Sequence, residues 1–412
     1  MHSCRALLLR AKRPIYSVVA VVALCFVLYY DWIISHDILG SLGFVSGDLE
    51  AGPMVQPNLG GFYLRSVQEV SAIEELDSPE MLSPLLPPIN VTEEERIAWF
   101  KEHLQEFDIF RNDNRTNEFH ARVTYFLGSG CDLSVFMTWI LPATLFGRRE
   151  LLALECLFRA NPNGCLVILS RSLDSSRGLA ILEPILSRGF KLLAVTPSLD
   201  LLLEKTPAMT WYHEIKNGSR DPGEIPLAQN LSNLLRLAVL YKYGGVYIDT
   251  DFIAIKEFIG LRNSIGAQSI NPETGKWTRI NNAVMAFDRG HPLLFKFMEE
   301  FGITFNGNKW GHNGPYLVSR VIARLKNRLG YNFTVLPPMA FYPVDWTKIG
   351  GLFKKPDNGD ERRWVEAKLL QLSETTYGVH LWNKQSKGME IEKESVMDRL
   401  ISKNCLLCRD AQ

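Results

Sequence analysis

The chain has 412 residues, of which 46% are hydrophobic and 22% charged, a composition typical of a globular protein with one large or two average domains. Lys and Arg number 45, as do Asp and Glu, so the formal net charge is zero. This balance provides no basic surface for nucleic acid, and we expect no nucleic-acid partner.

The seven cysteines leave an odd number outside the N-terminal segment, which holds Cys4 and Cys25. In an oxidising compartment, at least one of the other five is free or pairs outside the chain. Cys405 and Cys408 form a single CxxC without a second pair, which favours a disulfide or idle thiols over tetrahedral zinc.

The N-terminal segment predicts a membrane anchor. A basic cluster between Arg5 and Arg13 precedes an apolar segment that, at 15–34, approaches the ~20 residues needed to cross a bilayer. Basic residues on the N-terminal side predict a cytoplasmic tail over 1–14 and a single-pass type II orientation. The alternative is a cleaved signal peptide, but the apolar segment is long and no Ala-x-Ala site is evident.

Residues 35–91 contain six prolines and show no sustained periodicity, which predicts a disordered stem. Thr92 and Glu95 then form a capping-box pattern that begins a folded domain over 92–408.

Strand and helix patterns alternate after this point. The expected strands are 122–127, 165–169 and 190–195, and the expected helices are 149–158 and 179–186. This β-α-β order predicts a parallel, nucleotide-binding half. Neither a Gly-x-Gly-x-x-Gly turn nor a phosphate loop is present, so phosphates must be held in another way.

A stretch near the middle combines an apolar helix, a glycine turn and a short strand. Apolar residues recur at helical spacing between Leu231 and Tyr241. Gly244 and Gly245 end the helix, because glycine enters the left-handed conformation without a Cβ penalty. The uncharged β-formers at 246–248 predict a buried strand.

Asp249 and Asp251 follow at the carboxyl end of that strand, where ligands bind in open α/β sheets. Strand alternation would point both carboxylates to the same side. Converging carboxylates repel unless a cation joins them, and oxygen ligands suit Mn²⁺ or Mg²⁺. The pair therefore predicts a metal–diphosphate site; the alternative is a solvated strand end that carries two acids.

The later part of the chain is more mixed. A strand over 283–287 and helices over 292–301 and 316–325 are expected, with a polar, Gly-rich loop at 308–315. Residues 341–346 are aromatic and loop-like, and 377–383 alternate like a strand.

Five Asn-x-Ser/Thr sequons are present. If the domain is luminal, N-glycans are expected at Asn90, Asn114, Asn217 and Asn332. The fifth, Asn230, begins the apolar helix and should be the least accessible.

Six motifs occur in an order that is highly specific. They are Leu240-Tyr-Lys-Tyr-Gly-Gly-Val-Tyr-Ile-Asp-Thr-Asp-Phe252, Gly266-Ala-Gln-Ser269, Asn282-Ala-Val284, Trp310-Gly-His-Asn-Gly-Pro315, Leu336-Pro-Pro-Met-Ala-Phe-Tyr-Pro343 and Val379-His-Leu-Trp-Asn-Lys384. Over about 122–408 the chain resembles the Asp-x-Asp-containing α-1,4-glycosyltransferase family, which includes animal globotriaosylceramide synthase and uncharacterised plant relatives. Residues 137–140 and 146–150 resemble the plant branch.

The resemblance implies an α/β fold, the Rossmann-like glycosyltransferase A-type fold with a mostly parallel central sheet. It also implies a Golgi type II enzyme whose luminal catalytic domain spans 92–408. Such an enzyme transfers sugar from a nucleotide-sugar donor, in the first place a UDP-sugar, to a glycan or glycolipid acceptor. Retention of configuration, an α-1,4 linkage and dependence on Mn²⁺ or Mg²⁺ are the corresponding expectations.

The same resemblance suggests site residues. The metal would be bound by Asp251 and His380, with Asp249 contacting the donor and the metal. The donor residues would be Asn233, Arg236, Tyr247, Asp249, Asp251, Trp382 and Asn383. The loop and acceptor residues would be Asn282, Trp310 and His312.

Taken alone, these residues also have structural interpretations. His380 could be a buried histidine that donates to a carbonyl, and Asn233 with Arg236 could be a surface pair on one helix face. Trp310 and Trp382 could equally be aromatic residues of the core. His312 could brace the Gly-rich loop. Asn281 and Asn282 could mark the end of a strand.

Two departures from the family pattern leave the donor open. Many relatives carry Ser-Asp where this chain has Ser232-Asn233. Because the amide of Asn233 provides no charge, the resemblance does not identify galactose as the donor sugar. Residues 128–130, expected at the end of the first strand, also differ. For a nucleophile, Asp345 and Glu273 are available, but neither carries a motif.

Two other protein classes also fit parts of this sequence. An aspartate-dependent phosphatase fits a strand followed by two aspartates, but Ile253 stands where Thr or Val is usual, and Gly359-Asp360 lacks a later acidic partner. A non-catalytic lectin-like or scaffold protein on the same fold is the second.

Overall fold

The computed structural model describes residues 86–325 and 328–404. The expected tail and anchor, nearly all of the stem, and Cys4, Cys25, Cys405 and Cys408 lie outside these ranges. Within them, no helix is both long enough and apolar enough to span a bilayer.

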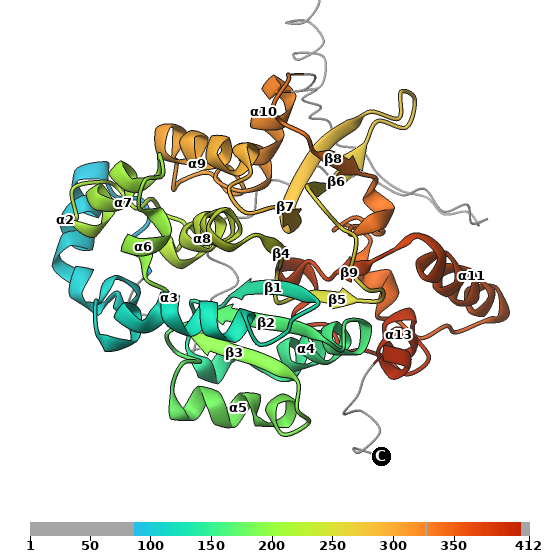
Figure 1. Ribbon diagram of the computed structural model, residues 1–412. Helices are drawn as coiled ribbons and strands as arrows, with labels where there is room; N and C mark the ends of the chain where they lie inside the picture. Colours follow the sequence, from blue (N-terminus) through green and yellow to red (C-terminus); the bar gives the residue numbers. More distant parts are fainter. Residues whose placement is uncertain (1–85, 326–327, 405–412) are drawn as a thin grey trace, which may run out of the picture. The chain divides into compact units, whose positions relative to one another are not determined.

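A twisted sheet of seven strands forms the centre of the described chain, in the order β3-β2-β1-β4-β7-β6-β8 (Figure 1). The strands are β1 (Leu133–Thr138), β2 (Gly164–Leu169), β3 (Lys191–Val195), β4 (Gly245–Ile248), β6 (Ser264–Ile270), β7 (Trp277–Phe287) and β8 (Thr334–Leu336). Pairing is parallel from β3 to β4 and between β6 and β8, and antiparallel where β7 meets β4 and β6. The prediction of a mostly parallel sheet is confirmed.

Helices cover both faces of the sheet (Figure 1). One face carries α3 (Asn114–Leu127), α6 (Leu199–Leu203), α7 (Met209–Lys216), α8 (Leu227–Tyr243), α9 (Pro292–Thr304) and α10 (Pro315–Leu325), and the other carries α4 (Arg148–Ala160) and α5 (Ser176–Leu186). Alternate residues of the strands enter opposite cores: Phe136 packs with the first group and Val135 with the second.

The first predicted strand was wrong. Residues 122–127 form the last turns of α3, and the first strand, β1, begins at Leu133. Asp113 caps α3 by accepting from the Thr116 N–H, and the buried positions Thr116, Phe119 and Val123 follow helical spacing. Residues 128–130 consequently end a helix and not a strand.

The other expected elements of the sheet and its covering helices are confirmed. The strands expected at 165–169, 190–195 and 283–287 are β2, β3 and the end of β7. The helices expected at 149–158 and 179–186 lie within α4 and α5, and those at 292–301 and 316–325 within α9 and α10.

α8 is buried over most of its length, and its buried residues include the polar Asn230 and Arg236 as well as its apolar positions. Gly244 ends it with φ 71°, and Gly245 begins β4 with φ 113°. A Cβ on Gly245 would lie 2.5 Å from the carbonyl oxygen of Ser134, so only glycine allows β4 to approach β1 here. The predicted helix–glycine–strand sequence is confirmed.

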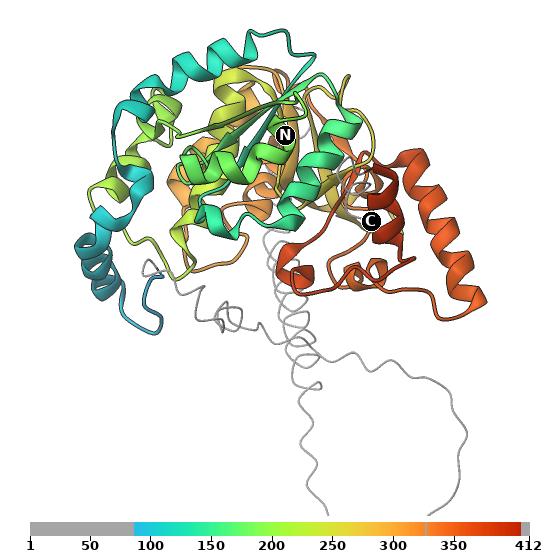
Figure 2. The ribbon, with the colours of Figure 1, turned by 90° about the horizontal axis from the view of Figure 1, so that it is seen from below.

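A smaller C-terminal layer packs beside the main sheet, against α4 (Figure 2). Its strands β5 (Phe252–Ala254) and β9 (Gly378–His380) pair antiparallel, with Phe252 opposite His380. Its helices are α11 (Gly359–Thr375), α12 (Asn383–Ser386) and α13 (Val396–Asn404), and short 3-10 turns occur at Pro338–Ala340 and Ile349–Leu352.

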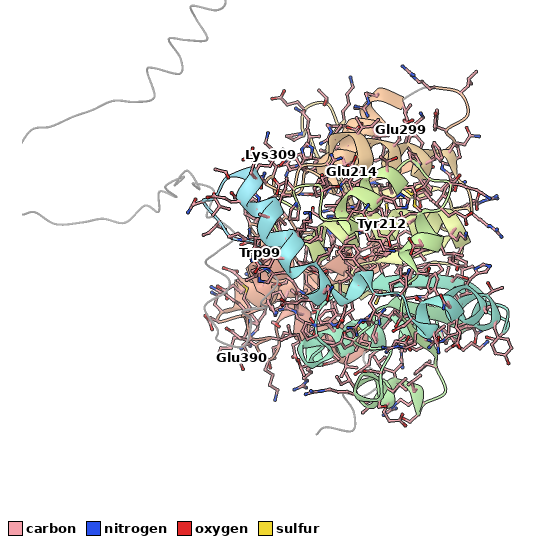
Figure 3. The ribbon with its side chains drawn as sticks, turned by 90° about the vertical axis from the view of Figure 1, so that its left-hand side faces the viewer. Trp99, Tyr212, Glu214, Glu299, Lys309 and Glu390 are labelled. Atoms are coloured by element: carbon pink, nitrogen blue, oxygen red, sulfur yellow. A yellow bond between two sulfur atoms is a disulfide. The ribbon has the colours of Figure 1, made fainter. Side chains whose placement is uncertain are left out.

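The N-terminal helix α2 (Glu93–His103) lies with α7 on the side shown in Figure 3, where Trp99 and Tyr212 are labelled. Its Thr92–Glu95 capping box is confirmed. Buried Arg96 forms a bidentate ion pair with Asp221, which fixes α2 to the loop after α7. Short 3-10 turns at Leu104–Glu106, Asp108–Phe110 and Ala143–Leu145 complete the described elements.

A disulfide joins Cys131 to Cys165, linking the entry of β1 to β2. Cys156 is free and buried, and burial raises the pKa of its thiol to about 12. Of the three cysteines among the described residues, two form this disulfide and Cys156 is free.

Exposure of the sequons follows the sequence prediction. Asn90, Asn114, Asn217 and Asn332 are exposed, while Asn230 is buried in α8.

Candidate active site

Asp249, Asp251 and His380 converge beyond the end of β4. Each offers one ligand atom, and the three atoms lie within 4.8 Å of one another. His380 Nε2 is 3.4 Å from Asp251 Oδ1 and 4.0 Å from Asp249 Oδ2. Two carboxylates and an imidazole suit a divalent cation, so the residues present fit the expected group.

Residues 249–251 form a turn, not an extension of the strand. The Phe252 N–H donates to the carbonyl oxygen of Asp249 at 3.2 Å, and β5 begins at Phe252. The turn, rather than strand alternation, brings the two carboxylates to the same side. β5 then pairs with β9, which delivers His380 from 129 residues later in the chain (380 minus 251).

Arg236 on α8 balances the charge of Asp249. Its Nη2 lies 3.0 Å from Asp249 Oδ1, and its Nη1 donates to Asp249 Oδ2 at 3.2 Å. Further donation to the Asn282 carbonyl and to Ser232 uses the rest of the guanidinium. Burial disfavours the charged arginine, but Asp249 outweighs it and raises the pKa of Arg236.

Tyr247 also contacts the Asp249 carboxylate. Its hydroxyl donates to Asp249 Oδ1 at 2.9 Å and lies 2.8 Å from Thr138 Oγ1. The Arg236 guanidinium stacks over the Tyr247 ring at 4.6 Å. Burial raises the pKa of Asp249; Arg236 opposes this shift and the neighbouring Asp251 adds to it. A cation between the aspartates would relieve that repulsion.

The turn after β9 completes the other half of the site. Asn383 donates its backbone N–H to Asp251 Oδ2 at 2.9 Å, and its side-chain Oδ1 is buried without a partner. Trp382 adopts the left-handed conformation (φ 54°, ψ 60°) and packs edge-on against His380. Such a backbone costs about 1–3 kcal/mol and persists only where its surroundings impose it.

Arg149, at the start of α4, holds that turn. Its Nη1 and Nη2 donate to the carbonyl oxygen and to Oγ of Ser386, and Ser386 Oγ in turn donates to the Leu381 carbonyl. Among the residues described, Arg149 has no ion-pair partner, and its Nε is buried without a partner. Burial lowers the pKa of Arg149, while Asp251 opposes that shift. The sequence alone predicted no role for Arg149, which belongs to the plant-like stretch at 146–150.

The second cluster of expected residues is centred on Asn233. Its Oδ1 accepts from Asn282 Nδ2 at 2.9 Å, and its Nδ2 donates back to the helix carbonyl of Gln229. Gly314 packs against it so closely that a Cβ there would lie 2.6 Å from Asn233 Oδ1. The loop before α10 therefore lies against α8.

His312 and Trp310 belong to this loop, whereas Glu273 and Asp345 lie elsewhere in the chain. His312 Nε2 is 2.8 Å from the Thr304 carbonyl, and burial lowers its pKa, so a neutral ring that donates this bond braces the loop. Trp310 remains 46% exposed. Glu273 and Asp345 are exposed in turns, where Asp345 accepts from Thr347.

Sequence comparison matches two parts of the chain to glycosyltransferase families. A region described as "Alpha 1,4-glycosyltransferase conserved region" matches residues 286–412, and a "Glycosyltransferase sugar-binding region containing DXD motif" matches 147–271. Together these matches include Asp249, Asp251 and His380.

Named relatives agree. Lactosylceramide 4-alpha-galactosyltransferase of Mus musculus is 35% identical over 59% of this chain and 65% of its own length, and that of Pongo pygmaeus is 36% identical over 48% and 86%. An uncharacterized protein of Arabidopsis thaliana, At4g19900, is 29% identical over 70% of this chain and 44% of its own. The chain thus spans less than two thirds of the mouse and Arabidopsis proteins. A solved structure, PaToxG glycosyltransferase, aligns over 76% of this chain and 95% of its own at 16% identity and TM-score 0.36. On the sequence matches, the chain belongs to the α-1,4-glycosyltransferase family.

Proposed function

We propose that this chain is a retaining, metal-dependent glycosyltransferase that moves a sugar from a UDP-sugar to a glycan or glycolipid acceptor, forming an α-1,4 linkage. The observation that carries the proposal is the convergence of Asp249, Asp251 and His380 beside a buried arginine. Family membership supports the same reaction class.

The proposed chemistry requires a leaving group that departs with negative charge. A bound Mn²⁺ or Mg²⁺ would offset the charge that develops on the diphosphate. Asp251 and His380 would hold the ion, Asp249 would contribute to it, and neither aspartate needs to act as acid or base. Asn383 adjoins the same group of residues through its N–H, which donates to Asp251, and its buried Oδ1 has no protein partner among the described residues.

Arg236 and Asn233 would lie on the sugar side of this site, with Tyr247 orienting Asp249 and Trp382 covering the diphosphate. Asn233 offers a neutral amide that the protein already hydrogen-bonds on both sides, so donor choice falls to hydroxyl geometry rather than to charge. Trp310, His312 and Asn282 would form the side from which an acceptor approaches.

The expected topology belongs to the same proposal: a cytoplasmic tail over 1–14, a signal anchor over 15–34, a stem over 35–91 and a Golgi-luminal catalytic domain over 92–408. Exposed sequons at Asn90, Asn114, Asn217 and Asn332 are compatible with a luminal domain, as is the Cys131–Cys165 disulfide.

The test combines metal binding with donor turnover. Free Mn²⁺ is followed by electron paramagnetic resonance as the purified full chain is added, and UDP release from a panel of UDP-sugars is measured with and without Mn²⁺. Asp251→Asn should lose both metal binding and Mn²⁺-dependent UDP release, while the exposed Asp360→Asn should retain both. Wild-type behaviour of Asp251→Asn would exclude the metal assignment, and a wild-type chain that binds Mn²⁺ without turning over any donor would favour a lectin-like role.

A further inference from the structure

Two exposed aromatic residues lie within seven positions of each other, where the Gly-rich loop leads into α10. Trp310 is 46% exposed and Tyr316, on α10, is 42% exposed. Between them, Gly311 has φ 69°, and a Cβ there would lie 3.1 Å from the Tyr316 ring. The Tyr316 N–H also donates to the Gly311 carbonyl. The bend at Gly311 thus brings Tyr316 back against the residue that directly follows Trp310.

A cation lies over each ring. Lys384 Nζ is 4.2 Å from the centre of the Trp310 ring, and the Arg279 guanidinium is 4.4 Å from that of Tyr316. In residues 86–325 and 328–404, neither cation forms an ion pair with a carboxylate. Both positive charges are therefore held in place while remaining available to an anion.

This aromatic–cation surface, formed by Arg279, Trp310, Tyr316 and Lys384, adjoins both halves of the site. Lys384 directly follows Asn383, which donates to Asp251. At the other end, Gly314 packs against Asn233. α10 and the β6–β7 hairpin that carries Arg279 lie next to each other (Figure 1).

We propose that this surface binds the acceptor and that the acceptor is an acidic saccharide, one that carries a carboxylate or sulfate close to the sugar that is extended. The proposal rests on the proposed glycosyltransferase function. Sugar rings place their apolar faces on aromatic side chains. A carboxylate or sulfate would then receive charge-assisted hydrogen bonds from Arg279 and Lys384. A surface built for a neutral saccharide needs the rings but not two unpaired cations.

The experiment measures binding of fluorescent oligogalacturonate to the purified full chain, with its methyl ester as the neutral probe of the same sugar sequence. Sulfated cello-oligosaccharides and unmodified cello-oligosaccharides form a second pair that separates charge from sugar identity. EDTA is present, so that no metal bridges probe and protein. Arg279→Gln/Lys384→Gln is compared with Arg279→Lys/Lys384→Arg and with Lys205→Gln, a control at an exposed lysine that pairs with Glu204.

At least one acidic probe should bind ten or more times more tightly than its neutral partner. This preference should disappear in the glutamine variant, weaken with salt and persist in the conservative variant and the control. Trp310→Ala should weaken both members of the pair. Equal affinity for acidic and neutral probes, no binding of any acidic probe, or wild-type binding by the glutamine variant would overturn the proposal. Mn²⁺-dependent UDP release, measured on the same preparations, reports separately on the proposed reaction.

Discussion

Arg236 and Asp249 form a two-point ion pair at the floor of the candidate site, with Nη2 3.0 Å from Oδ1 and Nη1 3.2 Å from Oδ2. The Arg236 guanidinium thereby fixes the orientation of the Asp249 carboxylate and offsets its negative charge even without a bound cation. The ion pair offsets the charge of Asp249, which lies close to the second carboxylate, Asp251.

Arg236→Lys should lower Mn²⁺-dependent UDP release by about 100-fold while the protein remains folded. Lysine keeps the charge but cannot donate to both carboxylate oxygens and to Asn282 and Ser232 at once. Arg262→Lys, in an exposed two-contact pair with Asp288, is the matched control and should be near wild type. Full activity of Arg236→Lys would show that the two-point contact is dispensable.

Arg149→Gln should weaken UDP binding in Mn²⁺ about tenfold, because the turn that carries Trp382 and Asn383 loses its two contacts to Ser386. Arg148→Gln, at the exposed neighbouring position, provides the control. Isothermal titration measures the affinity and thermal melting confirms folding. Equal affinities in the two variants would contradict a positioning role for Arg149.

Loss of the Cys131–Cys165 disulfide should lower the free energy of unfolding by about 3 kcal/mol, since the bridge closes a loop with a sequence separation of 34. The measurement is urea unfolding of wild type and Cys131→Ala/Cys165→Ala, each with and without dithiothreitol. Of these two proteins, the wild type should lose stability on reduction and the double variant should not. Cys156→Ala should respond to reductant as the wild type does, because the bridge remains intact.

Asp174→Asn should destabilise the protein by about 2 kcal/mol at pH 7, and the difference should shrink in acid. Burial alone would raise the pKa of Asp174, but hydrogen bonds from Arg122 and Thr196 outweigh it and lower that pKa. A depressed pKa contributes stability that is complete above the unfolded value near 4 and is lost as pH falls through the folded value. Urea unfolding at pH 7, 5 and 3.5 tests this, with the exposed Asp132→Asn as control. A pH-independent difference would contradict it.

Local patterns predicted much of the sheet, because its buried strands and apolar helices are marked by short-range periodicity and by glycine turns. They failed at 122–127, where Val123, Thr124, Tyr125 and Phe126 have strong β preference. The helix prevails there because the Asp113 cap starts it and because Phe119 and Val123 bury one face. Intrinsic preference is a weak guide once packing decides.

The site residues likewise fall into those that local sequence predicts and those that it does not. Asp249 and Asp251 are recognisable from the residues around them, whereas His380 and Asn383 came from family resemblance, since no spacing rule connects them to the aspartates. Arg149 had no such guide: a basic residue at the start of a helix looks like a surface residue until the fold places Ser386 over it. The available signal was the stretch at 146–150. It places two arginines at the start of a helix, where the helix dipole disfavours positive charge.

The pairing of β5 with β9 has a consequence for how the protein is made. A Cβ on Gly378 would lie 2.3 Å from the Phe252 ring, so β9, which carries His380, can pair with β5 only with glycine at this position. During translation the two aspartates leave the ribosome long before their histidine does, and the nascent chain has only half of an ion-binding site. A premature stop before Gly378 would therefore leave the seven strands of the main sheet encoded in full but would remove His380, the third residue of the candidate metal site.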